Sequence, residues 1–401
     1  MSEYLLVLTP KEPIRVGEAK AGSGYLDTLG YIPGSVLRGA LAEWLKAQGN
    51  GSAIVPIVRR MRFGNFLPSE SESAVPLPFP TTALECKQES GFRKVPRGSA
   101  KQKGHGIRDS LLIAVAYSEL ERRGARFPMP LLLRCTYTEN ERRCGARMDR
   151  VSGFYVQLPE GWKKVGVEKG LQTKVALSRH RRAAQEQMLY RVVGLRPHGV
   201  FIGRVWADDP SLVDLLKTAV AEMGIGGLTT RGFGTAELQE ATRIRPLPSL
   251  RDRLQAFNRA LREVWADLAD LARQVGHNVP AEPEGIYFSV DLLGPAVLRD
   301  PQTGLPTMKL RLEIGGQLLE PIWWAVQPAF VGGFSTAWGL PKPTALGVAR
   351  GSVYVFRCDI AEDVLIPELE RMEAQGVGER TDEGLGEVWV CHPFHQEVRP
   401  V

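Results

Sequence analysis

Hydrophobic residues recur along this chain with two different spacings, one typical of helices and one typical of strands, and segments of the two kinds follow one another. The strongest helical pattern covers residues 250–275, where an apolar residue returns every three or four positions. Ser249 and Asp252 form a capping box at its start. A second helix, with apolar positions from 36 to 45, is predicted to begin with Ser35 as its N-cap. The same spacing predicts further helices over residues 109–123, 211–223 and 362–375.

Short apolar runs, alternating or continuous, predict strands between these helices. They cover residues 3–9, 200–206, 235–244, 286–293, 307–314, 352–358 and 387–391. The order strand, helix, long interruption, strand, helix, strand is that of a ferredoxin-like domain. The pattern therefore predicts an α+β fold with two ferredoxin-like (RRM-like) domains.

A change in composition indicates where these domains begin and end. Residues 64–170 are rich in proline, glycine, serine and charged residues, and they interrupt the first domain. We predict an N-terminal ferredoxin-like domain over residues 1–248 that carries this large insertion. A connecting helix and linker follow over 249–284, and a C-terminal ferredoxin-like domain covers 285–401.

A glycine pattern occurs twice with the same internal spacing, and every position of the second copy follows the first by 152 residues. The first copy contains Gly224, Gly226, Thr229, Gly232 and Gly234, and the second contains Gly376, Gly378, Thr381, Gly384 and Gly386. Glycine is favoured where φ is positive or where two backbones approach closely. Either the two loops are turns whose backbone geometry requires glycine and that bind no ligand, or at least one of them binds a polyanion. The second copy is acidic, so we expect it to face protein.

Composition is that of a soluble protein with substantial hydrophobic cores. Hydrophobic residues make up 43% of the 401 residues, and the formal net charge is +6. This mild excess permits a nucleic-acid partner. The sequence has neither a signal-peptide pattern nor an apolar run long enough to span a bilayer. Five cysteines in a chain of this length do not suggest a disulfide framework. We therefore expect a cytoplasmic protein with no membrane partner.

Several motifs along the chain carry a family resemblance. The segment from Tyr31 to Ala40, which reads Tyr-Ile-Pro-Gly-Ser-x-x-Arg-Gly-Ala, resembles the RAMP superfamily of CRISPR-associated proteins when taken with the downstream glycine loop. In that family each ferredoxin-like domain has a glycine-rich loop between its last helix and last strand. The segment from Lys174 to Tyr190 is similar to the family's RNA-contacting segment. Residues 84–109 and 339–356 resemble the large two-domain, Cas-five-like subunits of type III-D effector complexes.

The resemblance implies a non-catalytic scaffold subunit that binds the repeat-derived 5′ handle of CRISPR RNA in antiviral defence. The implied partners are the large polymerase-like subunit and the backbone RAMP subunits of a type III effector ribonucleoprotein. Local chemistry agrees, because a helix start and a glycine-rich loop both offer backbone N–H groups to phosphates. The predicted RNA-binding residues are Ser35, Arg38, Lys174, Arg179, His180, Arg181, Arg182, Gly224, Gly226, Thr229, Arg231, Gly232 and Gly234.

Metal-binding residues fall inside the insertion. Cys86, His105, Cys135 and Cys144 make a complete set of four zinc ligands, although they contain no Cys-x-x-Cys pair. The alternatives are one structural zinc ion or free thiols in a reducing cell. Four protein ligands would leave no open position for catalysis.

Two other functions remain open at this stage. An endoribonuclease that processes precursor RNA or cuts target RNA would need a catalytic group, for which Asp27 and His180 are the candidates. A protein-only adaptor would use aromatic residues of the second domain, although such residues lie in cores more often than in interfaces. These aromatics are Trp323, Trp324, Phe330, Phe334 and Trp338. We expect His392 and His395, after the last strand, to be surface residues.

Overall fold

A computed structural model describes most of the chain. The described residues are 1–17, 27–72, 74–92, 104–127, 133–139, 141–158, 161–177, 180, 184–241, 248–335 and 339–397. The predicted α+β class is confirmed: within these ranges the structure has seven α-helices and antiparallel sheets. No described helix is both long enough and apolar enough to span a membrane.

The first sheet is built from segments at both ends of the predicted first domain. Its strands are β1 (Ser2–Pro10), β2 (Met61–Phe63), β3 (Leu67–Ser69), β14 (Val200–Ala207) and β15 (Ala236–Glu240). They lie in the order β15-β1-β14-β2, with β3 also paired to β14, and all pairs are antiparallel. The apolar faces of α1 (Gly34–Ala47) and α4 (Pro210–Met223) pack on this sheet and form one core with it. The short helices η1 (Gly51–Ala53) and α2 (Ile54–Val58) follow α1.

The second sheet has the equivalent strand order. It consists of β21 (Trp323–Ala325), β26 (Val353–Cys358), β16 (Ile286–Leu292) and β27 (Val388–Val390), in the order β21-β26-β16-β27. Helix α6 (Glu362–Gln375) connects β26 to β27, as α4 connects β14 to β15. In each sheet the first strand in sequence is central. In the first sheet β1 pairs with β14 and β15, and in the second β16 pairs with β26 and β27.

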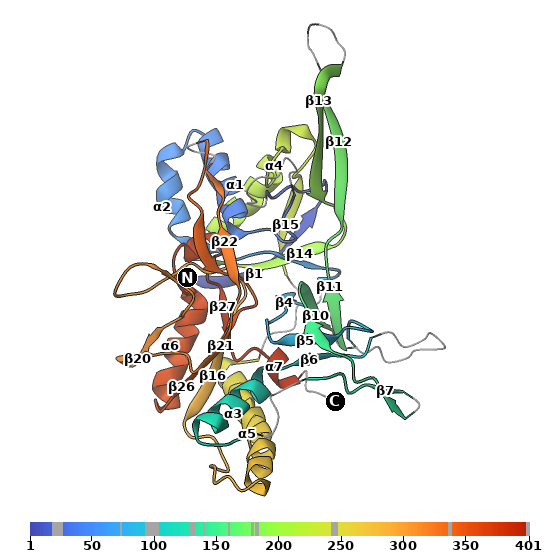
Figure 1. Cartoon of the computed structure of the whole chain (residues 1–401). Coiled ribbons are helices and arrows are strands. Elements are labelled where there is room, and N and C mark those ends of the chain that lie inside the picture. Colours follow the sequence, from blue (N-terminus) through green and yellow to red (C-terminus); the bar gives the residue numbers. More distant parts are fainter. Residues whose placement is uncertain are drawn as a thin grey trace.

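Helix α5 (Leu250–Gln274), predicted as a connection, is also part of the second core. Ser249 is confirmed as the N-cap, because the Asp252 backbone N–H donates to Ser249 Oγ at 3.1 Å, whereas the Asp252 carboxylate accepts from Ser249 Oγ at 2.6 Å. Phe257 and Trp265 are fully buried, and the Asn258 amide bonds both backbone groups of Tyr287 in β16. The predicted insertion supplies α3 (Leu111–Arg122), which packs against α5 in the same core (Figure 1).

Short strands make up the rest of the predicted insertion. One small sheet has the order β11-β10-β4 and another β6-β5-β9, and β7 pairs with β8. Their bounds are β4 Leu77–Pro78, β5 Ala83–Cys86, β6 Ile107–Asp109, β7 Thr138–Glu139, β8 Arg142–Arg143, β9 Met148–Arg150, β10 Phe154–Leu158 and β11 Gly161–Val165. After them, β12 (Lys169–Leu177) and β13 (Ala184–Leu195) form a long hairpin that projects away from the rest of the molecule (Figure 1).

Paired short strands also surround the second sheet. They are β17 (Leu298–Arg299) with β18 (Pro306–Thr307), β19 (Leu312–Ile314) with β20 (Gln317–Leu319), β22 (Pro328–Val331) with β25 (Ala345–Val348), and β23 (Phe334–Ser335) with β24 (Leu340–Pro341). The prediction of one strand over 307–314 is therefore wrong. Thr307 pairs with Leu298 in one hairpin, and residues 312–314 pair with β20 in another, whose turn is Gly315 and Gly316 with positive φ. The apolar run is thus divided between two partner strands.

Candidate nucleic-acid interface

The two glycine loops have the same backbone conformation. All eight glycines have positive φ, and so do Leu228 and Arg380, which are also separated by 152 residues. In the first loop the Ile225 N–H donates to the Gly234 carbonyl at 2.9 Å, and in the second the Val377 N–H donates to the Gly386 carbonyl at 2.8 Å. The short helices η2 (Thr229–Arg231) and η3 (Thr381–Glu383) occupy equivalent positions. The sequence repeat is thus a structural repeat.

The first loop is open to solvent and basic. Thr229, Arg231 and Gly232 are exposed, and a Cβ on Gly232 would meet no atom within 4 Å. The middle of the β12–β13 hairpin lies against this loop: Lys174 Nζ donates to the Arg231 carbonyl at 2.7 Å, and Arg231 Nη1 donates to the Tyr190 hydroxyl at 3.2 Å. Sequence-predicted residues from two segments therefore meet at one exposed surface.

The second loop is closed by the first part of the chain. Asn65 joins them, because its Nδ2 donates to the Gly384 carbonyl at 2.6 Å and its Oδ1 accepts from the Gly34 N–H at 3.3 Å. A Cβ on Gly384 would lie 2.8 Å from Asn65 Oδ1 and 3.0 Å from the Phe63 carbonyl oxygen. This loop packs on the start of α1, which agrees with the expectation that it faces protein.

Ion pairs complete that closure. Arg38 bonds Asp382 at 3.2 Å and Glu383 at 3.3 Å, and Lys342 bonds Glu383 at 2.8 Å. Burial raises the pKa of Glu383, but the hydrogen bonds from Lys342 and Arg380 outweigh it and hold the pKa below its usual value. The position equivalent to Glu383 in the first loop is Arg231, so the first loop has a cation where the second has an anion that is paired within the chain.

The structure corrects the predicted start of α1. Ser35 is not the N-cap, since the helix begins at Gly34 after Pro33, and the N-cap residue Pro33 makes no side-chain hydrogen bond. Asn65 supplies the oxygen that a capping side chain would have supplied. The role of Ser35 and Arg38 in RNA binding stays a prediction, and both lie beside the second loop rather than the first.

The remaining predicted RNA-binding residues lie on the hairpin between β12 and β13. His180 is exposed, whereas Arg179, Arg181 and Arg182 lie outside the described residues.

The four predicted metal ligands come together. Cys86, His105, Cys135 and Cys144 each offer one ligand atom, and these four atoms all lie within 4.8 Å of one another. They belong to separate segments of the insertion, so their convergence is a property of the fold.

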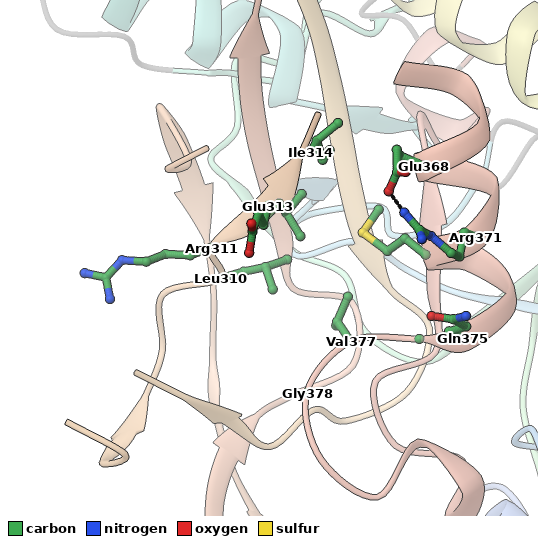
Figure 2. Close-up of a pocket in the computed structure, with 12 residues that line it drawn as sticks. Leu310, Arg311, Glu313, Ile314, Glu368, Arg371, Gln375, Val377 and Gly378 are labelled. Carbon is green, nitrogen blue, oxygen red and sulfur yellow. Dashed lines mark ion pairs between the residues drawn. The ribbon is translucent and has the colours of Figure 1, made fainter. Parts of the chain in front are cut away.

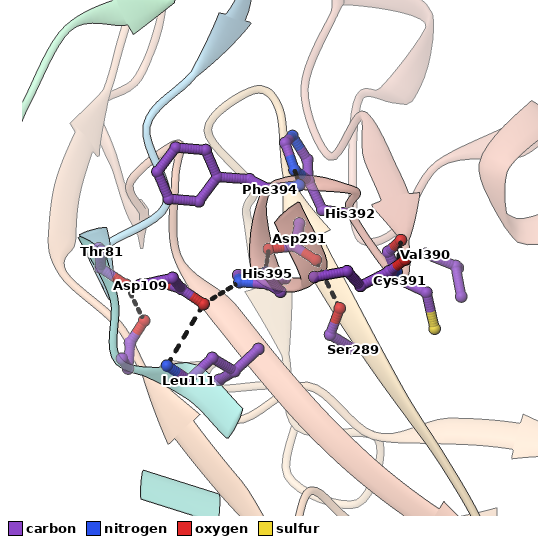
Figure 3. A network of polar contacts seen from close by, with 12 residues as sticks. Thr81, Asp109, Leu111, Ser289, Asp291, Val390, Cys391, His392, Phe394 and His395 are labelled. Carbon is purple, nitrogen blue, oxygen red and sulfur yellow. Dashed lines mark hydrogen bonds and ion pairs between the residues drawn. The ribbon is translucent and has the colours of Figure 1, made fainter. Parts of the chain in front are cut away.

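A buried ionic cluster was missed by the sequence analysis. His395, in the short helix α7 (Phe394–Glu397), lies between two carboxylates, with Nδ1 2.6 Å from Asp109 and Nε2 2.7 Å from Asp291 (Figure 3). The expectation that His392 and His395 are surface residues is therefore wrong, because they are 1% and 2% exposed. Only the apolar residue Phe394 between them hinted at burial.

The two histidines have opposite electrostatic environments. Burial lowers the pKa of His395, but the two carboxylates outweigh it and raise the pKa to about 10. Burial also raises the pKa of Asp291, and the charge and hydrogen bond of His395 bring it below its usual value. Burial dominates at His392 and lowers its pKa to about 3. At neutral pH we therefore assign His395 as an imidazolium ion and His392 as neutral.

Arg62 connects the two sheets. It is 5% exposed, its guanidinium lies 4.1 Å from the Trp206 ring, and it donates to the backbone carbonyls of Glu373 and Ala374 at the end of α6. Burial lowers the pKa of Arg62 to about 10. Its charge interacts favourably with the carboxyl end of α6.

Two further surface features bear on other functions. Phe330, Phe334 and Trp324 are 75%, 60% and 45% exposed, so the expectation that these aromatic residues lie in the core is wrong for these three, while Trp338 lies outside the described residues. A pocket of about 350 Å³ lies between β19 and the end of α6 (Figure 2). Glu368 and Arg371, which line it, pair with each other, and we assign it no ligand.

Comparisons with known proteins place this geometry in a family. The chain is similar to a subunit of a type III-B Cmr-beta complex bound to cognate target RNA and AMPPnP, with 13% identity, coverage of 88% of this chain and 86% of that chain, and a TM-score of 0.36. It is also similar to a chain of a Csm3–Csm4 subcomplex of a type III-A interference complex, with 14% identity, coverage of 90% and 96%, and a TM-score of 0.32. No curated protein matches. These structural similarities are weak, and the assignment rests on a match of the RAMP superfamily to residues 7–237, more than half of the chain. The chain therefore belongs to the RAMP superfamily.

Proposed function

We propose that this chain is a subunit of a type III CRISPR effector ribonucleoprotein and binds the 5′ handle of the CRISPR RNA at its first glycine loop. The observation that carries the proposal is the open loop of residues 224–234, beside which Lys174 and Arg231 present cations. Family membership supports it, as does the equivalent strand order of the two sheets, which we interpret as two ferredoxin-like domains. The partners would be the large polymerase-like subunit and the backbone RAMP subunits.

The chemistry of the first loop suits a phosphate backbone. Gly232 is exposed and a Cβ there would meet no atom within 4 Å, so a phosphate can approach the backbone at this position. Thr229 adds a hydroxyl donor, and the guanidinium of Arg231 fits phosphate oxygens in a bidentate manner. Lys174 and Tyr190 extend this surface onto the hairpin, where a tyrosine ring can stack on an unpaired base.

Neutralising two cations of this interface is expected to weaken RNA binding and its salt dependence. For Lys174→Ala/Arg231→Ala we expect the slope of log Kobs against log salt concentration to fall by about 1.4, because each single-strand phosphate contact contributes about 0.7. Fluorescence anisotropy with a labelled single-stranded RNA of the host repeat sequence measures it. Arg262→Ala/Arg273→Ala removes equal charge from the exposed face of α5 and should keep the wild-type slope. Equal slopes for both double variants would contradict the proposed interface.

We also propose that the chain itself does not cleave RNA. Asp27, one of two candidate catalytic groups, bonds Lys169 at 3.0 Å and accepts the Thr28 backbone N–H at 2.7 Å. These contacts suit a residue that ties the loop before α1 to the hairpin. Incubation of the full chain with precursor CRISPR RNA should give no products, and products that disappear with Asp27→Asn or His180→Gln would establish the endoribonuclease alternative. The adaptor alternative, through Phe330 and Phe334, stays a prediction.

A further inference from the structure

Cys86, His105, Cys135 and Cys144 come from segments that are held together by backbone hydrogen bonds. Cys86 ends β5, and the His105 N–H donates to the Glu89 carbonyl at 3.1 Å, so the segments that carry these two ligands lie side by side. Cys135 and Cys144 belong to one hairpin, in which the Cys135 N–H donates to the Ala146 carbonyl at 2.9 Å. The Lys87 N–H joins the two parts by donating to the Arg147 carbonyl at 3.1 Å.

Three of the six distances between ligand atoms fit a tetrahedron around zinc, and all six are within 4.8 Å. With Zn–S of about 2.3 Å and Zn–N of about 2.0–2.1 Å, tetrahedral geometry places two sulfurs about 3.8 Å apart and a sulfur and nitrogen about 3.5–3.6 Å apart. Cys86 Sγ lies 3.8 Å from Cys144 Sγ and 3.4 Å from His105 Nδ1, and Cys135 Sγ lies 3.6 Å from His105 Nδ1. A disulfide would need an S–S distance of about 2.05 Å.

The surroundings orient the ligands and balance the charge of such a site. The imidazole of His105 stacks on the Tyr137 ring, with centroids 4.1 Å apart and planes at 12°, which fixes the direction of Nδ1. Three thiolates and one Zn²⁺ carry a net charge of −1. Arg108, 7% exposed, supplies a nearby positive charge and donates to the Arg134 carbonyl at 3.3 Å, one residue before Cys135.

We propose that these four residues bind one structural zinc ion that holds the insertion together. The hydrophobic cluster around them is small, with only Cys86, Cys135 and Met148 as buried members, so apolar burial contributes little stability there. Binding joins the three sulfurs and Nδ1 to Zn²⁺ and releases the protons of the thiols that are protonated beforehand. All four positions are filled by protein, so the site has no open position for a substrate. This site is independent of the glycine loop.

Metal analysis of the full chain tests the proposal. Protein purified without chelator under reducing conditions should contain about one zinc per chain by elemental mass spectrometry. After removal of zinc, added Co²⁺ should give the sulfur-to-cobalt charge-transfer absorption of a tetrahedral thiolate site. Less than about 0.1 zinc per chain, with no Co²⁺ spectrum, would overturn the proposal. A Cys86–Cys144 disulfide in protein kept under reducing conditions would also overturn it.

Ligand variants distinguish this site from adventitious binding. His105→Gln should lose zinc, whereas His105→Cys, which restores a four-ligand set, should retain it. Cys358→Ala is the matched control, because Cys358 is a buried cysteine in β26, outside the cluster, and its loss should leave about one zinc per chain. Retention of zinc by both His105→Gln and Cys135→Ser would overturn the assignment. If a variant does not fold, the Co²⁺ spectrum of the wild-type chain still decides the proposal.

Discussion

Replacing His395 with glutamine is expected to lower the free energy of unfolding by about 3–5 kcal/mol, the usual cost of removing one partner from a buried ion pair. The side chain of His395 is fully buried and bonds Asp109 at 2.6 Å and Asp291 at 2.7 Å. Glutamine keeps an amide donor but leaves two buried carboxylates without a positive charge between them. Urea unfolding of the full chain, followed by tryptophan fluorescence, measures the difference.

The pH dependence of the same variant identifies the charge as the cause. The pKa of His395 is about 10 in the folded chain and about 6.5 when unfolded, so its stabilisation is complete below pH 6.5 and is lost as the pH rises towards 10. The wild type should therefore lose stability over this interval relative to His395→Gln. His392 acts in the opposite direction: its folded pKa is about 3, so the protein loses stability as the pH falls from 6.5 towards 3.

Two variants serve as controls for His395. His198→Gln changes an exposed histidine and should leave stability within about 0.5 kcal/mol of the wild type. Adding Asp109→Asn to His395→Gln removes one of the unbalanced carboxylates and should recover part of the lost stability. A double variant less stable than His395→Gln alone, together with parallel pH profiles for His395→Gln and the wild type, would show that His395 stabilises the fold by packing and not by charge.

Local patterns predicted five of the described α-helices and six strands of the two large sheets, because the residues that decide these elements are close in sequence. The stripe of α5 with its cap at Ser249, and the short apolar runs of β1 and β14, were each visible within a few residues. The glycine repeat was equally local, since positive φ at fixed positions favours glycine at those positions.

Contacts between distant segments explain what the sequence could not reveal. The cap of α1 comes from Asn65, more than thirty residues away, so Ser35 was a reasonable but wrong choice. The carboxylates around His395 come from β6 and β16, at positions 109 and 291, and no spacing rule joins them. The metal ligands were predicted from residue type alone, and only the fold shows that Cys86 and Cys144 are neighbours.

Replacing Gly386 with alanine should destabilise the protein by about 1–3 kcal/mol more than the same change at Gly232. Both glycines have positive φ, 62° and 76°, so both substitutions carry a similar backbone penalty of about 1–2 kcal/mol. The two sites differ in the room available for the added methyl group: a Cβ on Gly386 would overlap the Val377 carbonyl oxygen, whereas one on Gly232 would meet nothing within 4 Å. The difference in unfolding free energy, measured in urea, therefore isolates the close backbone approach.

The repeat supplies an internal check on this result. Gly234 is the counterpart of Gly386, and its Cβ would overlap the Ile225 carbonyl oxygen, the counterpart of Val377. Gly234→Ala should therefore behave like Gly386→Ala, although one loop is open and the other is packed on α1. A Gly234→Ala protein as stable as Gly232→Ala would show that packing on α1, rather than the geometry common to the two loops, makes Gly386 necessary. Matching losses at Gly234 and Gly386 would show that the glycine pattern is maintained by the loop itself, whether or not RNA is bound.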